Sequence, residues 1–331
     1  MDPVTHLAAG GIQGTALKPL VAAKHLLLFC VLASWLPDID NLAGFFGPEF
    51  YLVHHRGVTH SLLGGLVLAA VFAALFHLWD RTLPLVTGSL VAYAGIVNHI
   101  FLDLITSYGT QIFAPLSRGR FSVQCVFIID PVFTLSLILV LILIRMKPRH
   151  QTRIACLGLL WLVAYPALNL GLRLGLEAHL RERLRLQGEA FSTLELAPEA
   201  LAPLNWKLIV DAGDRYRLAA VSLLQPNGPL RFEEFTKADR ALLESLGGRV
   251  EFFRTYAWFA MYPVMAVAPT AEGSRVTFQD LRFRSTLAWV RNLFRNRDGP
   301  FSLTADFDRR GDLVAYTYQQ SRVVRVVQQL E

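Results

Sequence analysis

Apolar runs long enough to cross a lipid bilayer constrain this chain more than any other feature. Residues 61–79 form a run of 19 in which His77 is the one strongly polar side chain. A helix that spans a bilayer needs about 20 mainly apolar residues. The other candidate crossings are residues 20–36, 83–105, 126–144 and 154–172. We therefore expect about five transmembrane helices, preceded by a shorter, Gly-rich packing helix at residues 4–17.

Charged side chains separate the chain into two parts. Residues 1–174 contain 18 Asp, Glu, Lys and Arg, whereas residues 175–331 contain 40. This contrast predicts a membrane domain over residues 1–174 and a soluble domain over residues 175–331. The predicted fold class is an α-helical membrane bundle of about five transmembrane helices, followed by a small, mostly antiparallel α+β domain.

Alternating apolar and polar residues predict the strands of the soluble domain. Two of them are joined by a turn at residues 211–214, and a short helix with Thr236 as its N-cap is expected at residues 236–246. The predicted strands are residues 206–210, 216–224, 250–262, 275–284 and 301–318.

The basic loops predict the orientation of the bundle. Residues 145–153 hold the densest group of Lys and Arg, and short basic loops favour the cytoplasmic side. Counting back through the crossings then places residues 38–60 and 99–103 on the extracytoplasmic side, although Arg118 and Arg120 argue against this. Topogenic charge explains the net charge of +6, so we expect no nucleic-acid partner.

Eight of the nine histidines lie in the membrane domain, which a lipid-facing bundle does not explain. The most informative motif is HRGVTHS at residues 55–61, directly before an apolar run. Such a dense polar motif at the mouth of a membrane helix is costly unless something binds it. The PDID motif at residues 37–40 and the NHIFLD motif at residues 98–103 supply similar side chains.

Histidine and aspartate together suit a metal ion. His99 and Asp103 are four residues apart, so on a helix they share one face. Mixed His and carboxylate ligands fit Zn²⁺, Mn²⁺ or Fe²⁺ better than Mg²⁺ or Ca²⁺. We expect Zn²⁺ first, with one or two ions bound. The candidate metal ligands are His6, Asp38, Asp40, His55, His60, His99 and Asp103.

Arg56, Asp40 and His54 are the candidate catalytic residues. The guanidinium of Arg56 can hold a phosphate or carboxylate through two hydrogen bonds. Acids and imidazoles that do not bind the metal can orient the ligands or act as a general base. Each motif also has a structural interpretation: a hydrogen bond within a helix, a helix-ending turn with solvated acids, or an interfacial loop.

The order of these motifs resembles the family of membrane-bound metal-dependent hydrolases that includes the LexA-regulated inner-membrane protein YdjM. The matching residues are Thr5-His6 and the motifs at 37–40, 55–61 and 98–103, within residues 1–170. Residues 280–283 and the strand at Trp206 are similar to the longer members. The resemblance implies a hydrolase in the inner membrane of a bacterium. The alternation of His and Asp is also similar to zinc-dependent phospholipase C and related nucleases, which favours phosphoesters.

The predicted function is a membrane-embedded, metal-dependent hydrolase that uses a metal-activated water. Its expected surroundings are the lipid bilayer, and its expected substrate is membrane-associated, with a phospholipid or another phosphoester as the candidates. The site and the soluble domain are expected on the extracytoplasmic face. The alternatives are a metal transporter and a membrane-anchored binding module. The oligomeric state is not predicted.

Overall fold

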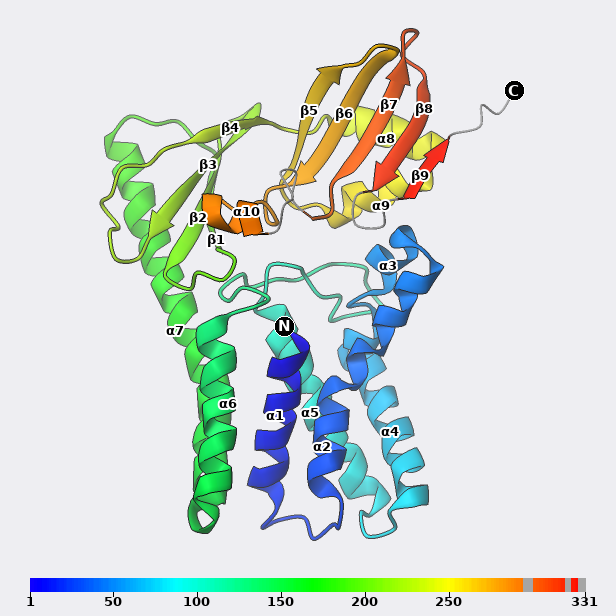
Figure 1. Ribbon diagram of the computed structural model, residues 1–331, viewed down its shortest axis with the longest axis vertical. Helices are drawn as coiled ribbons and strands as arrows, with labels where there is room; N and C mark the ends of the chain where they lie inside the picture. Colours follow the sequence, from blue (N-terminus) through cyan, green and yellow to red (C-terminus); the bar gives the residue numbers. More distant parts are fainter. Residues whose placement is uncertain (294–299, 319–322, 327–331) are drawn as a thin grey trace. The chain divides into compact units, whose positions relative to one another are not determined.

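Figure 1 shows the computed structural model of the chain, which describes residues 1–293, 300–318 and 323–326. The described chain forms two compact units. We call the first the helical unit; it comprises Met1–Leu42, His54–Leu174 and Ala200–Pro203. We call the second the sheet unit; it comprises Ala43–Val53, Gly175–Glu199 and the described residues from Leu204 onward.

Residues 1–186 are mostly helical, with a long connection of turns at residues 105–130. In chain order the helices are α1 (Pro3–Leu17), α2 (Leu26–Trp35), η1 (Leu36–Phe46), α3 (Pro48–His54), η2 (Val58–His60), α4 (Leu62–Trp79), α5 (Leu85–Leu104), α6 (Pro131–Met146), η3 (Pro148–His150) and α7 (Gln151–Leu186). The η elements are 3₁₀ helices. The Gly-rich segment at residues 4–17 is a helix, as predicted.

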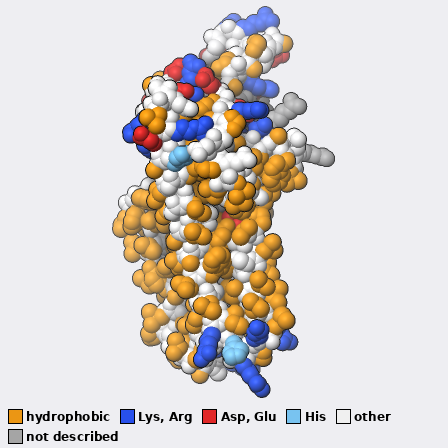
Figure 2. All heavy atoms as spheres, turned by 90° about the vertical axis from the view of Figure 1, so that its left-hand side faces the viewer, with side chains coloured by type: hydrophobic (Ala, Val, Ile, Leu, Met, Phe, Trp, Pro, Cys, Tyr) orange, Lys and Arg blue, Asp and Glu red, His pale blue; other side chains and the backbone are white. Residues whose placement is uncertain are grey.

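Four helical segments among the described residues are long and apolar enough to cross a membrane: Leu26–Phe46, Leu62–Trp79, Leu85–Leu104 and Pro148–Leu186. The fifth predicted crossing is α6, which is apolar but has only 16 residues. Apolar side chains cover the flank of the bundle that Figure 2 shows. For example, Leu135 on α6 and Leu160 on α7 are each 63% exposed. Such a surface matches lipid rather than water, so the helical unit is a membrane bundle.

The ends of these helices place polar loops together. The Ser61 hydroxyl accepts a hydrogen bond from the Gly64 N–H and so caps α4. The Asp130 carboxylate caps α6 by accepting from the Phe133 N–H. Figure 1 shows which helix ends lie together at one end of the bundle. They are the start of α1, the C-terminal ends of α2 and α5, and the N-terminal ends of α4 and α6. The predicted orientation of this end, away from the cytoplasm, stays a prediction.

The sheet unit contains two antiparallel sheets. The first has the strand order β1 (Thr193–Pro198), β2 (Asn205–Asp211), β3 (Arg215–Ser222) and β4 (Glu233–Thr236). The second has the order β5 (Pro263–Pro269), β6 (Gly273–Asp280), β7 (Leu303–Asp308), β8 (Leu313–Tyr318) and β9 (Val323–Val326). The helices are α8 (Arg240–Arg249), α9 (Glu251–Phe259) and α10 (Ala288–Leu293). The predicted α+β class is thus confirmed, and the last turns of α7 pack on the first sheet through Leu176, Leu180 and Leu184.

Two predicted elements of this unit are wrong. Residues 250–262 were expected as a strand, yet most of them form α9 (Glu251–Phe259). Phe252, Tyr256 and Phe259 are buried there at intervals of three and four residues, which is a helical period. The helix expected at residues 236–246 starts later, because the Asp239 carboxylate caps α8 by accepting from the Ala241 N–H.

Buried charges connect the two sheets. Asp280 and Arg282, whose side chains are fully buried, form an ion pair at 2.7 Å, and Arg282 also donates to the Phe259 carbonyl at 2.8 Å. The Lys207 ammonium on β2 donates to the carbonyls of Arg282 and Arg284 at 2.6 and 3.0 Å. Burial lowers the pKa of Lys207. These contacts give residues 280–283 a structural task.

A glycine sets the distance between α1 and α2. A Cβ atom at Gly10 would lie 2.7 Å from the Cys30 carbonyl oxygen and 2.8 Å from the Ser34 hydroxyl. Both atoms belong to residues of α2, and the Cys30 carbonyl oxygen is a main-chain atom. Any larger residue would therefore push the two helices apart.

We expect Gly10→Ala to lower the free energy of unfolding by roughly 1–3 kcal/mol through this overpacking. Gly171→Ala is the matched control, because a Cβ there has nothing within 4 Å. Removing that glycine from a helix should be neutral or slightly stabilising. Thermal unfolding in detergent measures both variants, and equal melting temperatures would contradict the close approach.

Candidate metal centre

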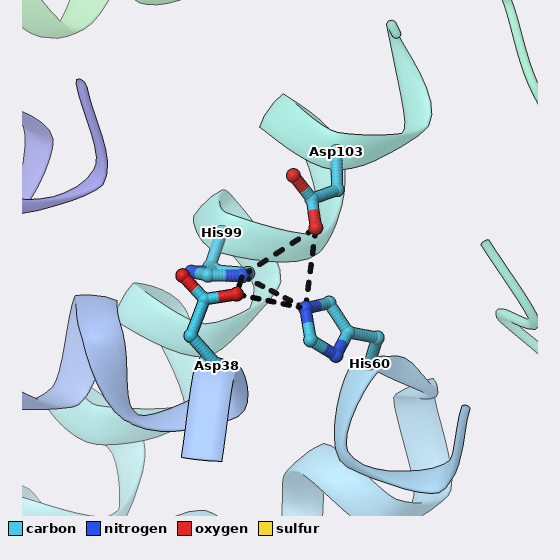
Figure 3. A group of neighbouring side chains, drawn as sticks. All are labelled: Asp38, His60, His99 and Asp103. Carbon is cyan, nitrogen blue, oxygen red and sulfur yellow. Dashed lines mark hydrogen bonds and ion pairs between the residues drawn. The ribbon is translucent and has the colours of Figure 1, made fainter. Parts of the chain in front are cut away.

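Four side chains converge at the polar end of the bundle (Figure 3). Asp38 comes from η1, His60 ends η2, and His99 and Asp103 lie one turn apart on α5. Each offers one ligand atom, and these four atoms lie within 4.8 Å of one another. We call these four residues the His/Asp cluster. Segments from three separate parts of the sequence therefore meet at one point.

The distances inside the cluster are short. The Nε2 atoms of His60 and His99 are 3.0 Å apart. Asp103 Oδ2 lies 3.2 Å from His60 Nε2 and 3.6 Å from His99 Nε2. Asp38 Oδ1 lies 3.7 Å from each of the two nitrogens. Ligands about 2.0–2.1 Å from a tetrahedral metal ion stand roughly 3.3 Å from one another, so five of the six separations are close to those of a tetrahedral site.

The far sides of the two rings determine which nitrogen faces the cluster. His99 Nδ1 lies 2.7 Å from the Ser34 carbonyl oxygen, which can only accept, so Nδ1 carries the proton. His60 Nδ1 lies 2.9 Å from Asp40 Oδ2, which likewise can only accept. In the neutral rings both Nε2 atoms are therefore acceptors. Two lone pairs facing each other across 3.0 Å require a positive charge between them.

The charge of the cluster also attracts a cation. Burial lowers the pKa of His60, but the carboxylates of Asp103, Asp38 and Asp40 outweigh this effect and raise the pKa to about 10. His60, His99 and Asp103 are essentially inaccessible, whereas the Asp38 side chain is 11% exposed. The cluster thus draws in either a proton or a metal ion, and Asp38 is the member through which it reaches the surface.

Local geometry explains why Asp38 and Asp40 act differently. A 3₁₀ helix has about three residues per turn, so side chains two positions apart point in different directions. Asp38 faces the cluster, whereas Asp40 faces the loop at residues 55–60. Asp40 Oδ1 accepts from His55 Nδ1 at 2.9 Å, and Oδ2 accepts from the Arg56 N–H and the Thr59 hydroxyl. Asp40, predicted as both ligand and catalytic residue, is placed behind His60 instead.

His6 is beside the cluster without being one of its four members. Its ring stacks on His99, with centroids 3.6 Å apart, and its Nε2 lies 3.3 Å from Asp103 Oδ1. The side chain is fully buried, and among the described residues neither ring nitrogen has a hydrogen-bond partner. The Met1 amino group contacts the same oxygen of Asp103. His6 is thus positioned to supply a fifth ligand.

Arg56 neutralises the buried Asp103. Its Nε lies 3.0 Å from Asp103 Oδ2, and its Nη1 donates to the Thr106 hydroxyl at 2.8 Å. The guanidinium also lies over the Tyr108 ring, 4.9 Å from its centroid. Arg56 has a φ of +58°, a conformation that is costly for a residue with a side chain. Its N–H bond to Asp40 and the bond from the Gln111 N–H to its carbonyl hold it there.

Besides Asp40, the predicted residues His55 and His54 also lie outside the cluster. His55 is buried, and its Nδ1 is bound to Asp40. Burial lowers the pKa of His55, against the raising effect of Asp40. His54 is exposed at the end of α3. Among the seven predicted ligands, the structure gathers Asp38, His60, His99 and Asp103 around one point, with His6 next to them.

Sequence reasoning missed two partners, Ser34 and Thr106. The carbonyl of Ser34 is a main-chain group, but Pro37 was a signal for it. In a 3₁₀ helix the N–H of residue 37 would bond to the carbonyl of residue 34, and proline has no N–H. The Ser34 carbonyl is thereby left for His99. Thr106 follows the NHIFLD motif by three residues, and nothing in the sequence pairs it with Arg56.

Comparison with known proteins finds relatives that match part of the chain. The uncharacterized protein YfhP of Bacillus subtilis (strain 168) is 30% identical over 145 residues, which are 41% of this chain and 44% of that protein. The inner membrane protein YdjM of Escherichia coli (strain K12) is 29% identical over 121 residues, 33% of this chain and 60% of that protein. The protein of the same name from Shigella flexneri matches to the same extent. The chain thus spans less than two thirds of the length of these relatives.

No solved structure matches the chain. A family model described as YdjM inner membrane protein matches residues 1–175. The match covers more than half of the 331 residues, and it includes the whole His/Asp cluster. Together with the apolar helices, it makes the chain an integral protein of the inner membrane. The chain belongs to the YdjM inner membrane protein family.

Proposed function

We propose that this protein is a metal-dependent hydrolase whose metal ion is held by Asp38, His60, His99 and Asp103, with His6 in reach. One observation supports this most strongly: His60 and His99 turn their Nε2 atoms toward each other at 3.0 Å, with both Nδ1 atoms held by acceptors. An arrangement of two imidazoles and two carboxylates is a donor set for a divalent ion.

The residues present fit one ion of the Zn²⁺, Mn²⁺ or Fe²⁺ class. The two ring nitrogens of His6 are buried without hydrogen-bond partners in the described chain, and buried polar atoms are rarely left so. Asp40 is occupied by His55, Arg56 and Thr59, which argues against a second ion there. A bound divalent ion would supply a Lewis acid and a water of lowered pKa.

The surrounding residues position and balance this site. Asp40 and the Ser34 carbonyl orient the two imidazoles, as outer partners of metal-binding histidines do. Arg56 offsets the charge of Asp103 at 3.0 Å. Its Nε and Nη1 are engaged there, so Nη2 is the nitrogen for which the described residues supply no acceptor. A guanidinium that contacts the cluster through Asp103 suits an anionic substrate such as a phosphoester.

The substrate is proposed to be membrane-associated because of where the cluster lies. His99 and Asp103 belong to the last turns of α5, a helix long enough to cross the bilayer. The site therefore stands near the end of a membrane helix. A phospholipid, or another phosphoester carried on a lipid, would present its phosphate at this depth.

The first expected outcome concerns bound metal. Wild-type protein purified in detergent should contain about one Zn²⁺, Mn²⁺ or Fe²⁺ per chain, measured by mass spectrometry of the elements. His60→Ala and Asp103→Ala should lose it, because each removes one of four ligands. His150→Ala is the control, since His150 is exposed in the loop before α7. Folded wild-type protein that stays metal-free after resupply would reject the site.

Asp40→Asn tests the positioning of His60. The carboxamide keeps one accepting oxygen and replaces the other by an NH2 donor, so the two histidine Nδ1–H groups and the other donors that now bind Asp40 can no longer all be accepted. The support for the His60 tautomer is thereby weakened, and metal affinity should fall roughly 10- to 100-fold. Competition with a chelator measures this affinity. Asp80→Asn is the matched control, because Asp80 Oδ2 contacts His25 Nδ1 at 2.9 Å, away from the cluster. Equal losses in both variants would show a general structural effect.

Arg56→Lys tests the phosphoester assignment. Losing the planar fork should lower kcat/KM for a chromogenic phosphodiester, or for phospholipid in vesicles, roughly 10- to 100-fold, with metal content unchanged. Arg120→Lys is the control, because Arg120 lies over the same Tyr108 ring at 4.8 Å. Metal-loaded wild type that hydrolyses neither substrate but carries metal ions into liposomes would support transport instead.

A further inference from the structure

A groove opens in the helical unit between α1, α2 and α6, and its volume is about 420 Å³. Leu7 and Gly11 of α1 line it, together with Leu27 and Val31 of α2 and Leu141 of α6. Leu7 and Leu27 are 37% and 42% exposed, so the groove is open at the lipid-facing surface. Its volume is in the range of small-ligand sites, and its walls suit a hydrocarbon chain.

Polar side chains line one end of this groove. Lys18 follows the last turn of α1, Arg145 lies in the last turn of α6, and Gln151 begins α7. The Lys18 ammonium donates to Gln151 Oε1 at 3.5 Å. Lys18 and Arg145 are exposed, and neither forms an ion pair with another described residue. Two cations therefore stand at the mouth of an apolar groove.

The whole of this bundle end is positively charged. Figure 2 shows Lys and Arg side chains gathered there. The basic residues in its loops and helix ends are Lys18, Lys24, Arg81, Arg145, Lys147, Arg149 and Arg153. Asp80 is the one acidic residue in these connections, and it is held by Thr82 and His25. The mouth thus has unbalanced positive charge that an anion would complement.

The length of the groove matches one lipid of one leaflet. Leu7 and Lys18 are 11 positions apart on one helix, or about 16 Å along its axis. Half of the hydrocarbon core of a bilayer is about 15 Å thick. A lipid whose phosphate lies at Lys18 and Arg145 would therefore extend an acyl chain to the level of Leu7.

We propose that this groove binds an anionic phospholipid, with its phosphate between Lys18 and Arg145 and one acyl chain against Leu7, Leu27 and Leu141. Basic pockets between membrane helices recognise anionic headgroups in this manner. The basic mouth of the groove lies at the end of the bundle opposite the His/Asp cluster. The proposal does not rest on the proposed hydrolysis, because none of the residues that line the groove belongs to the cluster.

The test is lipid binding to the full chain by native mass spectrometry after delipidation. Phosphatidylglycerol should bind about one per chain, and phosphatidylcholine, whose headgroup has no net charge, should bind at least tenfold more weakly. Lys18→Gln with Arg145→Gln should weaken phosphatidylglycerol binding roughly 30-fold, since each basic residue near a membrane surface contributes about fivefold. Arg149→Gln with Arg153→Gln removes the same charge outside the groove and should change it less than about threefold.

A second pair of variants tests the apolar wall without changing charge. Leu27→Trp should fill the groove and reduce phosphatidylglycerol binding about tenfold or more. Leu28→Trp is its control, because Leu28 is similarly exposed, at 45%, but does not line the groove. Equal effects of the two charge pairs, equal binding of both lipids, or a groove covered by a second copy of the chain in cross-linking would each overturn the proposal.

Discussion

The burial of Asp103 is the constraint on which the rest of the polar end depends. Its side chain is 1% exposed near the end of a membrane helix, and a buried carboxylate is costly unless it is paired. Arg56, His6, His60 and His99 lie within 3.0–3.6 Å of its oxygens. These partners come from α1, from the loop before α4 and from α5 itself. One carboxylate thus gathers segments that are distant in the sequence, and a bound cation would complete its neutralisation.

The two ends of the bundle are chemically opposite. One end holds the His/Asp cluster in a setting where acceptors behind the rings direct both Nε2 atoms inward. The other end carries Lys and Arg around an open apolar groove. Because low-dielectric surroundings make each charge costly, both ends concentrate their charge where it has a partner or reaches water. The proposed hydrolysis at the first end and the proposed lipid binding at the second would both act on molecules of the same membrane.

Much of the fold could be predicted because membrane helices leave a strong local signal. The run at residues 61–79 became α4, and the turn at residues 211–214 joins β2 and β3 as expected. The strand predicted at residues 250–262 is wrong, because the period of the buried Phe252, Tyr256 and Phe259 is that of a helix. The site residues Asp38, His60, His99 and Asp103 were all named in advance. The sequence did not show that Asp38 belongs to the cluster whereas Asp40 lies behind His60, because the two aspartates differ only in the direction in which η1 points them.

The sequence by itself determined that polar, metal-binding side chains stand at the ends of membrane-length helices, because hydropathy and residue type are local properties. The tertiary structure alone decided that His60 and His99 face each other, that Asp40 stands behind His60, and that Ser34 offers its carbonyl to His99. It also decided that α1, α2 and α6 leave a groove beside Lys18. These outcomes depend on helix rotation and on which main-chain groups remain unpaired, and both are set only when the helices pack.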